Sequence, residues 1–148
     1  MSSTDGRWAS VQDFTVDIIG PDGDCVVLTV AGELDAYTAP VLRDRMRDLT
    51  AVGVRHVIID LRGVSFLDST GLGVLIGGLK RFREHEGSFA PVATQPRIFK
   101  LIQITGLTSV FPLRPTVQEA IEADPHWRQV AEAKAGGAAD WCTQHDLT

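Results

Sequence analysis

The residues of this chain best suited to take part in chemistry stand together at Asp68, Ser69 and Thr70, a carboxylate followed by two hydroxyls. They lie between an apolar run and a segment whose apolar residues recur at spacings of three, four and seven, which is typical of one face of a helix. Short polar side chains cap helix N-termini, because their oxygens accept hydrogen bonds from first-turn N–H groups. Three adjacent candidates are more than one helix needs, so the sequence leaves open whether Ser69 is the cap or has another role.

Glycine is unusually frequent in this expected helix, with Gly71, Gly73, Gly77 and Gly78 inside eight positions. Each glycine costs a helix about 1 kcal/mol relative to alanine. We therefore expect another surface to approach the helix closely and offset that cost. For Gly71 and Gly73 the surface is either a binding partner or the neighbouring strand, and the sequence does not decide between them.

Catalysis is not indicated. A serine hydrolase would need a nucleophile elbow of the Gly-x-Ser-x-Gly kind, but Ser69 is preceded by Leu-Asp and followed by Thr-Gly. The chain has neither a phosphate loop of the Gly-x-x-x-x-Gly-Lys-Ser/Thr kind nor a dinucleotide fingerprint. The histidines are scattered without ligand spacing, at His56, His85, His126 and His145. We therefore expect no enzyme activity, no metal and no cofactor.

The composition is that of a globular protein of about one domain, with 148 residues, 44% hydrophobic and 22% charged. A formal net charge of −5 argues against a nucleic-acid-binding protein, which needs a basic surface. No apolar run approaches the ~20 residues that span a bilayer, and the first residues do not form a signal peptide. Cys25 and Cys142 match no zinc or redox spacing. We expect a cytoplasmic protein with two reduced thiols, no membrane segment and no nucleic-acid partner.

The elements that would position Asp68–Thr70 follow from periodicity and turn chemistry. Residues 14–19 and 25–30 predict a hairpin around a turn at 21–24, and residues 56–61 predict a strand buried on both faces. Thr38 is expected to cap a helix that contains Pro40 in its first turn. The Asp68–Thr70 helix is expected to continue to about residue 86.

The remaining elements complete the predicted fold. A strand at residues 88–94 contains Pro91, which lacks a backbone donor, so we expect this strand to be at a sheet edge, bulged or short. Further helices are expected at 96–105 and from the Thr116 capping box. The order predicts an α/β fold with a mixed β-sheet of four to five strands and helices mainly on one face. Residues 1–11 are expected to be flexible, 12–123 to form the domain, and 124–148 to be a C-terminal tail, partly helical.

Three sequence motifs resemble those of a known protein family. They are Gly32-Glu33-Leu34-Asp35, Asp68-Ser69-Thr70-Gly71-Leu72-Gly73-Val74 and Ile104-Thr105-Gly106-Leu107. In order and spacing the chain resembles bacterial anti-sigma factor antagonists, the STAS-domain proteins, over about residues 13–122. Pro91 departs from the uninterrupted apolar strand that the family usually has, and the resemblance does not reach the tail.

The resemblance implies a STAS-like fold and a role in transcription regulation by partner switching. It implies that Ser69 is phosphorylated by an anti-sigma factor that is also a serine kinase. The unphosphorylated antagonist would bind that partner and release the sigma factor, and a phosphatase would restore the binding form. ATP would be bound by the kinase and not by this chain.

The implied partner-binding surface surrounds Ser69. Its candidate residues are Glu33, Asp35, Tyr37, Thr38, Asp68, Ser69, Thr70, Gly71, Leu72 and Gly73. The four residues of the earlier loop, from Glu33 to Thr38, could equally be ordinary solvated positions. Thr70 could be a second phosphoacceptor, but a cap or a hydroxyl at the core edge is the simpler interpretation. A different class of function also stays open, a STAS scaffold or ligand-sensing subunit of a larger assembly in which Ser69 only caps.

Overall fold

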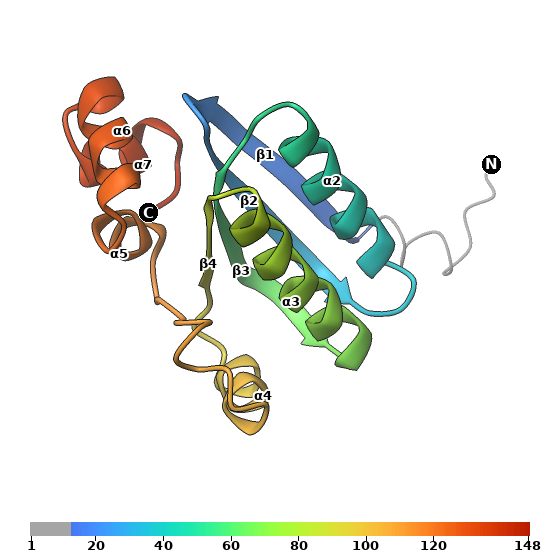
Figure 1. The fold of residues 1–148 in the computed structure, drawn as a ribbon. Coiled ribbons are helices and arrows are strands. Elements are labelled where there is room, and N and C mark those ends of the chain that lie inside the picture. Colours follow the sequence, from blue (N-terminus) through green and yellow to red (C-terminus); the bar gives the residue numbers. More distant parts are fainter. Residues whose placement is uncertain (1–12) are drawn as a thin grey trace, which may run out of the picture.

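The computed structural model describes residues 13–148, with a four-stranded mixed sheet at its centre (Figure 1). The strands are β1 (Thr15–Asp22), β2 (Cys25–Leu34), β3 (His56–Leu67) and β4 (Ser88–Val92), in the order β1-β2-β3-β4. β1 pairs antiparallel with β2, whereas β2–β3 and β3–β4 are parallel. The predicted α/β class and mixed sheet are confirmed. The predicted flexible segment, residues 1–11, lies outside the described residues.

One face of the sheet is covered by α2 (Ala39–Ala51) and α3 (Ser69–Glu84), which lie side by side (Figure 1). Both helices turn an apolar stripe to the sheet, as the spacing in the sequence predicts. α4 (Pro96–Ile104) lies beyond the carboxyl end of β3 and adds Ile98 and Ile102 to the same core. No helix among residues 13–148 has the length and apolar character to cross a bilayer.

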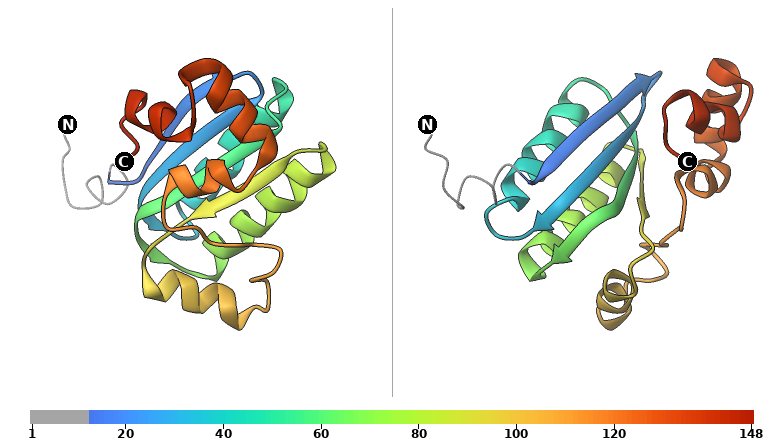
Figure 2. Two further views of the ribbon diagram at one scale, coloured as in Figure 1. Left: turned by 90° about the vertical axis from the view of Figure 1, so that its left-hand side faces the viewer. Right: turned by 180° about the vertical axis from the view of Figure 1, so that it is seen from behind.

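The opposite face is covered by α5 (Val117–Glu122), α6 (Pro125–Ala135) and α7 (Ala138–Gln144) (Figure 2). A second core forms there between these helices and the outward-facing residues of β2, β3 and β4. Trp127 and Trp141 are both fully buried in it and meet edge to face, with ring centroids 5.3 Å apart. Residues 124–148 were expected to be an appended tail, yet α6 and α7 lie on the domain, so helices cover both faces of the sheet.

Polar contacts fix this C-terminal part to the sheet. The indole Nε1 of Trp141 donates to Asp22 Oδ2 at 2.7 Å, across 119 residues of chain. Asp124 caps α6 by accepting from the backbone N–H groups of His126 and Trp127. Gly136 ends α6 with φ 92°, a left-handed conformation that glycine adopts without strain. The segment is therefore held by burial, by a cap at each end of α6 and by a partly buried hydrogen bond.

Pro91 lies in an edge strand, as predicted. β4 is the last strand of the sheet, and the Pro91 carbonyl accepts from the backbone N–H of Arg114 at 3.2 Å on the side away from β3. Because the N and C=O of one strand residue point the same way, the missing N–H of Pro91 faces this outer side. The ladder to β3 therefore loses no donor. A single bridge between Val92 and Arg114 continues the pairing outward.

The glycines of α3 divide into two kinds. A Cβ at Gly71 would lie 2.5 Å from the Leu34 carbonyl oxygen, and one at Gly78 would lie 2.6 Å from Met46 Sδ. At Gly73 and Gly77 a Cβ would meet no described heavy atom within 4 Å. Gly71 and Gly78 therefore permit the close packing of α3 on the sheet and on α2, whereas Gly73 and Gly77 leave an open surface.

The burial of Trp141 generates a stability prediction. We expect Trp141→Ala to lower the free energy of unfolding by about 3–5 kcal/mol, because it opens a cavity in the second core and removes the donor from Asp22. Chemical denaturation followed by far-ultraviolet circular dichroism measures the change. Ile104→Ala, at a side chain that is 75% exposed, is the control and should change stability by no more than about 0.5 kcal/mol. Equal effects in the two variants would show that α7 is not part of the folded core.

The glycines generate a paired prediction on one helix. Gly71→Ala should destabilise the protein by about 1–3 kcal/mol, because the added methyl group collides with a backbone carbonyl. Gly73→Ala should leave stability unchanged or raise it by up to about 1 kcal/mol, since alanine is the better helix former and the space is open. Urea unfolding of both variants beside the wild type tests the pair, and a larger loss at Gly73 than at Gly71 would contradict it.

Candidate functional site

Two loops emerge next to one another at the carboxyl ends of β2 and β3. The parallel register pairs Glu33 with Phe66 and Leu34 with Leu67, so the two strands end together. The backbone N–H of Asp68 then donates to the Leu34 carbonyl at 3.3 Å. The sequence motifs around positions 33 and 69, which are far apart along the chain, are thereby brought to one edge of the sheet, where α/β proteins commonly place their binding sites.

Asp68, and not Ser69, is the N-cap of α3. Asp68 has extended backbone angles, and its Oδ1 accepts from the backbone N–H of Gly71 at 2.9 Å. Ser69 is the first residue of the helix and is exposed. Within residues 13–148 no group forms a hydrogen bond with the Ser69 hydroxyl. Ser69 is therefore not the helix cap, because its neighbour supplies the cap, and its hydroxyl is accessible at the start of the helix.

The loop between β2 and α2 is held by its own side chains. Asp35 Oδ1 accepts from the backbone N–H groups of Tyr37 and Thr38, at 2.9 and 3.1 Å. The Thr38 hydroxyl donates to the Glu33 carbonyl at 2.7 Å. Thr38 was expected to cap α2 with its side chain, but it forms no such bond. Its hydroxyl is already committed to this loop, which holds Tyr37 outward.

Accessibility separates the predicted partner-binding residues into three groups. Thr38, Gly71 and Leu72 are buried, and their contacts are internal to the domain. Asp35 and Asp68 are partly buried and organise the two loops. Exposed positions at this edge are Glu33, Tyr37, Ser69, Thr70 and Gly73, among which Tyr37 is 88% exposed. A binding partner can reach the exposed group directly and the others only through them.

A groove that sequence reasoning missed runs between α2 and α3. It has a volume of about 220 Å³, and Arg43, Arg47 and Arg81 line it beside Gly73 and Gly77. The missing side chains of the two glycines form its open floor. The sequence could have indicated part of this groove, because Arg43 and Arg47 are one turn apart on α2 and share a face. The contribution of Arg81 could not be predicted, because it depends on how the two helices pack. The groove begins one helical turn beyond Ser69 and presents positive charge.

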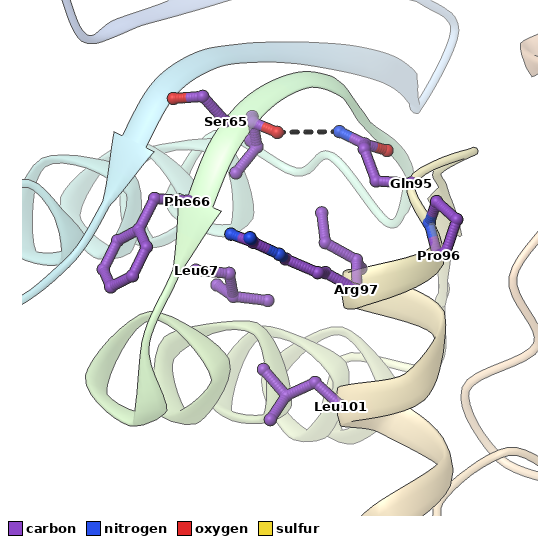
Figure 3. A pocket seen from close by; sticks show the side chains of 9 residues that line it. Ser65, Phe66, Leu67, Gln95, Pro96, Arg97 and Leu101 are labelled. Carbon is purple, nitrogen blue, oxygen red and sulfur yellow. Dashed lines mark hydrogen bonds between the residues drawn. The ribbon is translucent and has the colours of Figure 1, made fainter.

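A second hollow lies between the end of β3 and the start of α4 (Figure 3). It has a volume of about 500 Å³ and is mostly apolar, with Phe66 and Leu67 on one side and Leu101 on the other. The Arg97 side chain extends from α4 across it (Figure 3). The Gln95 amide donates to the Val64 carbonyl at 2.7 Å and so ties the start of α4 to β3. The sequence showed α4 only as an amphipathic helix and did not reveal this pocket.

Residues with metal-ligand chemistry come together at the opposite ends of β2 and β3. Asp24, Cys25 and His126 each offer a donor atom, and these atoms lie within 4.8 Å of one another. This cluster is separate from the edge that carries Ser69, because Cys25 and His56 are the first residues of their parallel strands. Within the described chain the Ser69 edge has no comparable set of ligands.

Comparison with known proteins supports the resemblance seen in the sequence. Residues 16–120 match the family model of the STAS domain. The chain is 34% identical over 103 residues to the anti-sigma-B factor antagonist of Listeria monocytogenes, covering 70% of this chain and 90% of that protein. It is 36% identical over 102 residues to the anti-sigma-B factor antagonist of Bacillus subtilis, covering 69% and 92%.

The structure agrees with these sequence matches. It aligns with the crystal structure of an anti-sigma factor antagonist from Mycobacterium paratuberculosis with a TM-score of 0.67 and 35% identity, covering 74% of this chain and 92% of that one. The family match ends at residue 120, so α6 and α7 lie beyond it. Because the family model covers residues 16–120 and the relatives are 34% and 36% identical over most of their own lengths, the chain belongs to the STAS domain family.

Proposed function

We propose that this protein is an anti-sigma factor antagonist, a cytoplasmic binding protein and not an enzyme, whose partner is an anti-sigma factor with serine kinase activity. The observation that carries the proposal is the exposed Ser69 hydroxyl at the first residue of α3, beside a helix cap that Asp68 already provides. The unphosphorylated form binds the anti-sigma factor and thereby releases the sigma factor. Phosphorylation of Ser69 blocks that binding, and a phosphatase reverses it.

The position of Ser69 suits a switch that changes the surface and not the fold. A phosphate adds a charge of about −1.5 to −2 and three acceptor oxygens. The N-terminus of α3, a helix of 16 residues, favours an anion through its N–H groups and dipole. The neighbouring Asp68 carboxylate adds negative charge at the same place. An uncompensated charge forced into an interface costs on the order of 3–5 kcal/mol, which weakens binding by two to three orders of magnitude.

The surface available to the partner is narrower than the sequence suggested. It consists of the exposed residues Glu33, Tyr37, Ser69, Thr70 and Gly73, and it continues into the groove between α2 and α3. Tyr37 offers the large, exposed aromatic side chain that often anchors an interface. The three arginines of the groove are complementary to acidic side chains on the anti-sigma factor.

Substitutions at Ser69 test the proposal. We expect wild type and Ser69→Ala to capture the same anti-sigma factor from a lysate of the source organism, and Ser69→Glu to lose it because of the added charge. After identification by mass spectrometry, the purified partner should phosphorylate the wild type on Ser69 and bind Ser69→Glu at least about 100-fold more weakly. Thr143→Glu, at an exposed residue of α7 outside this surface, is the control for added charge and should bind like the wild type. Equal binding of wild type and Ser69→Glu, with no phosphate on Ser69, would refute the phospho-switch.

The pocket beside α4 favours a second candidate. A STAS sensor or scaffold subunit of a larger signalling assembly would bind a small ligand there and use Ser69 only as a helix residue. The pocket volume of about 500 Å³ lies within the range of small-molecule sites. The Ser69 experiment separates the two, because a sensor would show the same partners for all Ser69 variants.

A further inference from the structure

The β1–β2 turn and α6 lie beside one another (Figure 2). The joint between them contains a group of side chains that the proposed function does not use. Asp24 lies in the turn, Cys25 is the first residue of β2, and His126 is the second residue of α6, about a hundred residues later in the chain. Along the sequence these three residues do not have the spacing that is typical of metal ligands. The fold assembles them because α6 packs on the face of the sheet where Cys25 points.

The donor atoms of this group face one another. His126 Nε2 lies 2.6 Å from Asp24 Oδ1, and Cys25 Sγ lies 3.8 Å from the same oxygen. The thiol is fully buried, whereas the side chains of His126 and Asp24 are 40% and 33% exposed. An ion can therefore reach the two exposed ligands from solvent and find the sulfur behind them.

Neighbouring residues orient the His126 ring. The His56 ring stacks on it with centroids 4.0 Å apart and 22° between the planes. His56 Nδ1 lies 2.9 Å from Ser88 Oγ, which donates to Asp124 Oδ2 at 2.9 Å. The stacked His56 ring therefore limits how far the His126 ring can turn and so helps to position it as a ligand.

The donor set selects a class of ion. Calcium and magnesium take six or more oxygen ligands, whereas one sulfur, one imidazole nitrogen and one carboxylate oxygen suit zinc and similar divalent transition metals. Donors on one tetrahedral zinc ion lie about 3.3–3.7 Å apart, given its bond lengths of about 2.0–2.3 Å. The Cys25–Asp24 distance of 3.8 Å is just above this range. The pair of Asp24 and His126 needs to open by about 0.7–1 Å, a small movement for partly exposed side chains.

We propose that Asp24, Cys25 and His126 bind a zinc-type divalent ion that ties α6 to the β1–β2 turn, with water completing the coordination. On binding, the Cys25 thiol loses its proton to solvent and the sulfur becomes a thiolate ligand. The ion joins the STAS domain to α6, which lies beyond the family match, and its expected effect is to stabilise the attachment of the C-terminal helices. Because it lies at the far end of the sheet from Ser69, its test does not depend on the anti-sigma partner.

Metal titration of the full-length protein tests the proposal. In the presence of a non-chelating reductant, Co²⁺ should give the sulfur-to-metal charge-transfer absorption of a cobalt thiolate, with one equivalent bound. Zn²⁺ at a free concentration 100-fold above its Kd should raise Tm by about 5–10 °C. Cys25→Ser should abolish the charge-transfer band, and His126→Gln should weaken Co²⁺ binding at least about tenfold.

Matched residues in α7 and at its C-terminal end provide the controls. Cys142→Ser removes the other buried thiol, and His145→Gln removes the histidine beside Asp22. Both variants should keep the band and the Tm shift. Since Cys25→Ser could unfold the second core, Asp24→Asn, at a partly exposed position, serves as a further variant and should also weaken binding. No charge-transfer band in the wild type, or equal Tm shifts in all variants, would show that the cluster is only a hydrogen-bonded joint.

Discussion

The parallel pairing of β2 with β3 is the interaction on which the rest of the molecule depends. From Cys25–His56 to Leu34–Leu67 the two strands run together through the centre of the sheet. Most of their side chains are buried, alternately in the two cores. The pairing brings the loops that follow Leu34 and Leu67 to one edge and the turn at Asp24 to the other. The Ser69 site is therefore a consequence of this strand register, whereas the cluster at His126 also depends on the packing of α6.

Close packing at the start of α3 explains why Ser69 is available for chemistry. The missing side chain of Gly71 lets the first turn of the helix approach the Leu34 carbonyl, and the Asp68 carboxylate satisfies the N–H of the same glycine. These two contacts fix the helix start without using Ser69. A covalent change at Ser69 therefore adds charge to the surface but breaks no contact that holds α3 in place.

Features with a local physical cause could be predicted from the sequence. The hairpin, the edge position of Pro91 and the helix N-cap at Thr116 each depend on a few adjacent residues, and the structure contains all three. The reciprocal half of the predicted capping box, from Glu119 to the Thr116 backbone N–H, is not among the hydrogen bonds of the described residues. The motif around Ser69 was also recognisable from adjacent residues. The different roles of Gly71 and Gly73 could not be predicted in this way, because they depend on which face of the helix meets β2. The groove between α2 and α3 and the approach of His126 to Asp24 likewise require tertiary packing, which periodicity does not encode.

The C-terminal helices are better understood as part of the fold than as an appendage. Val27, Ile58 and Val92 turn away from α2 and α3, and α5, α6 and α7 cover them. Without that cover, these side chains and Trp127 would form a contiguous apolar patch on the sheet, which soluble domains rarely leave exposed. The helices therefore stabilise the face that lies opposite α3. A partner that docks beside Ser69 meets α2, α3 and the two loops, so binding and release at that edge can proceed while the second core stays closed.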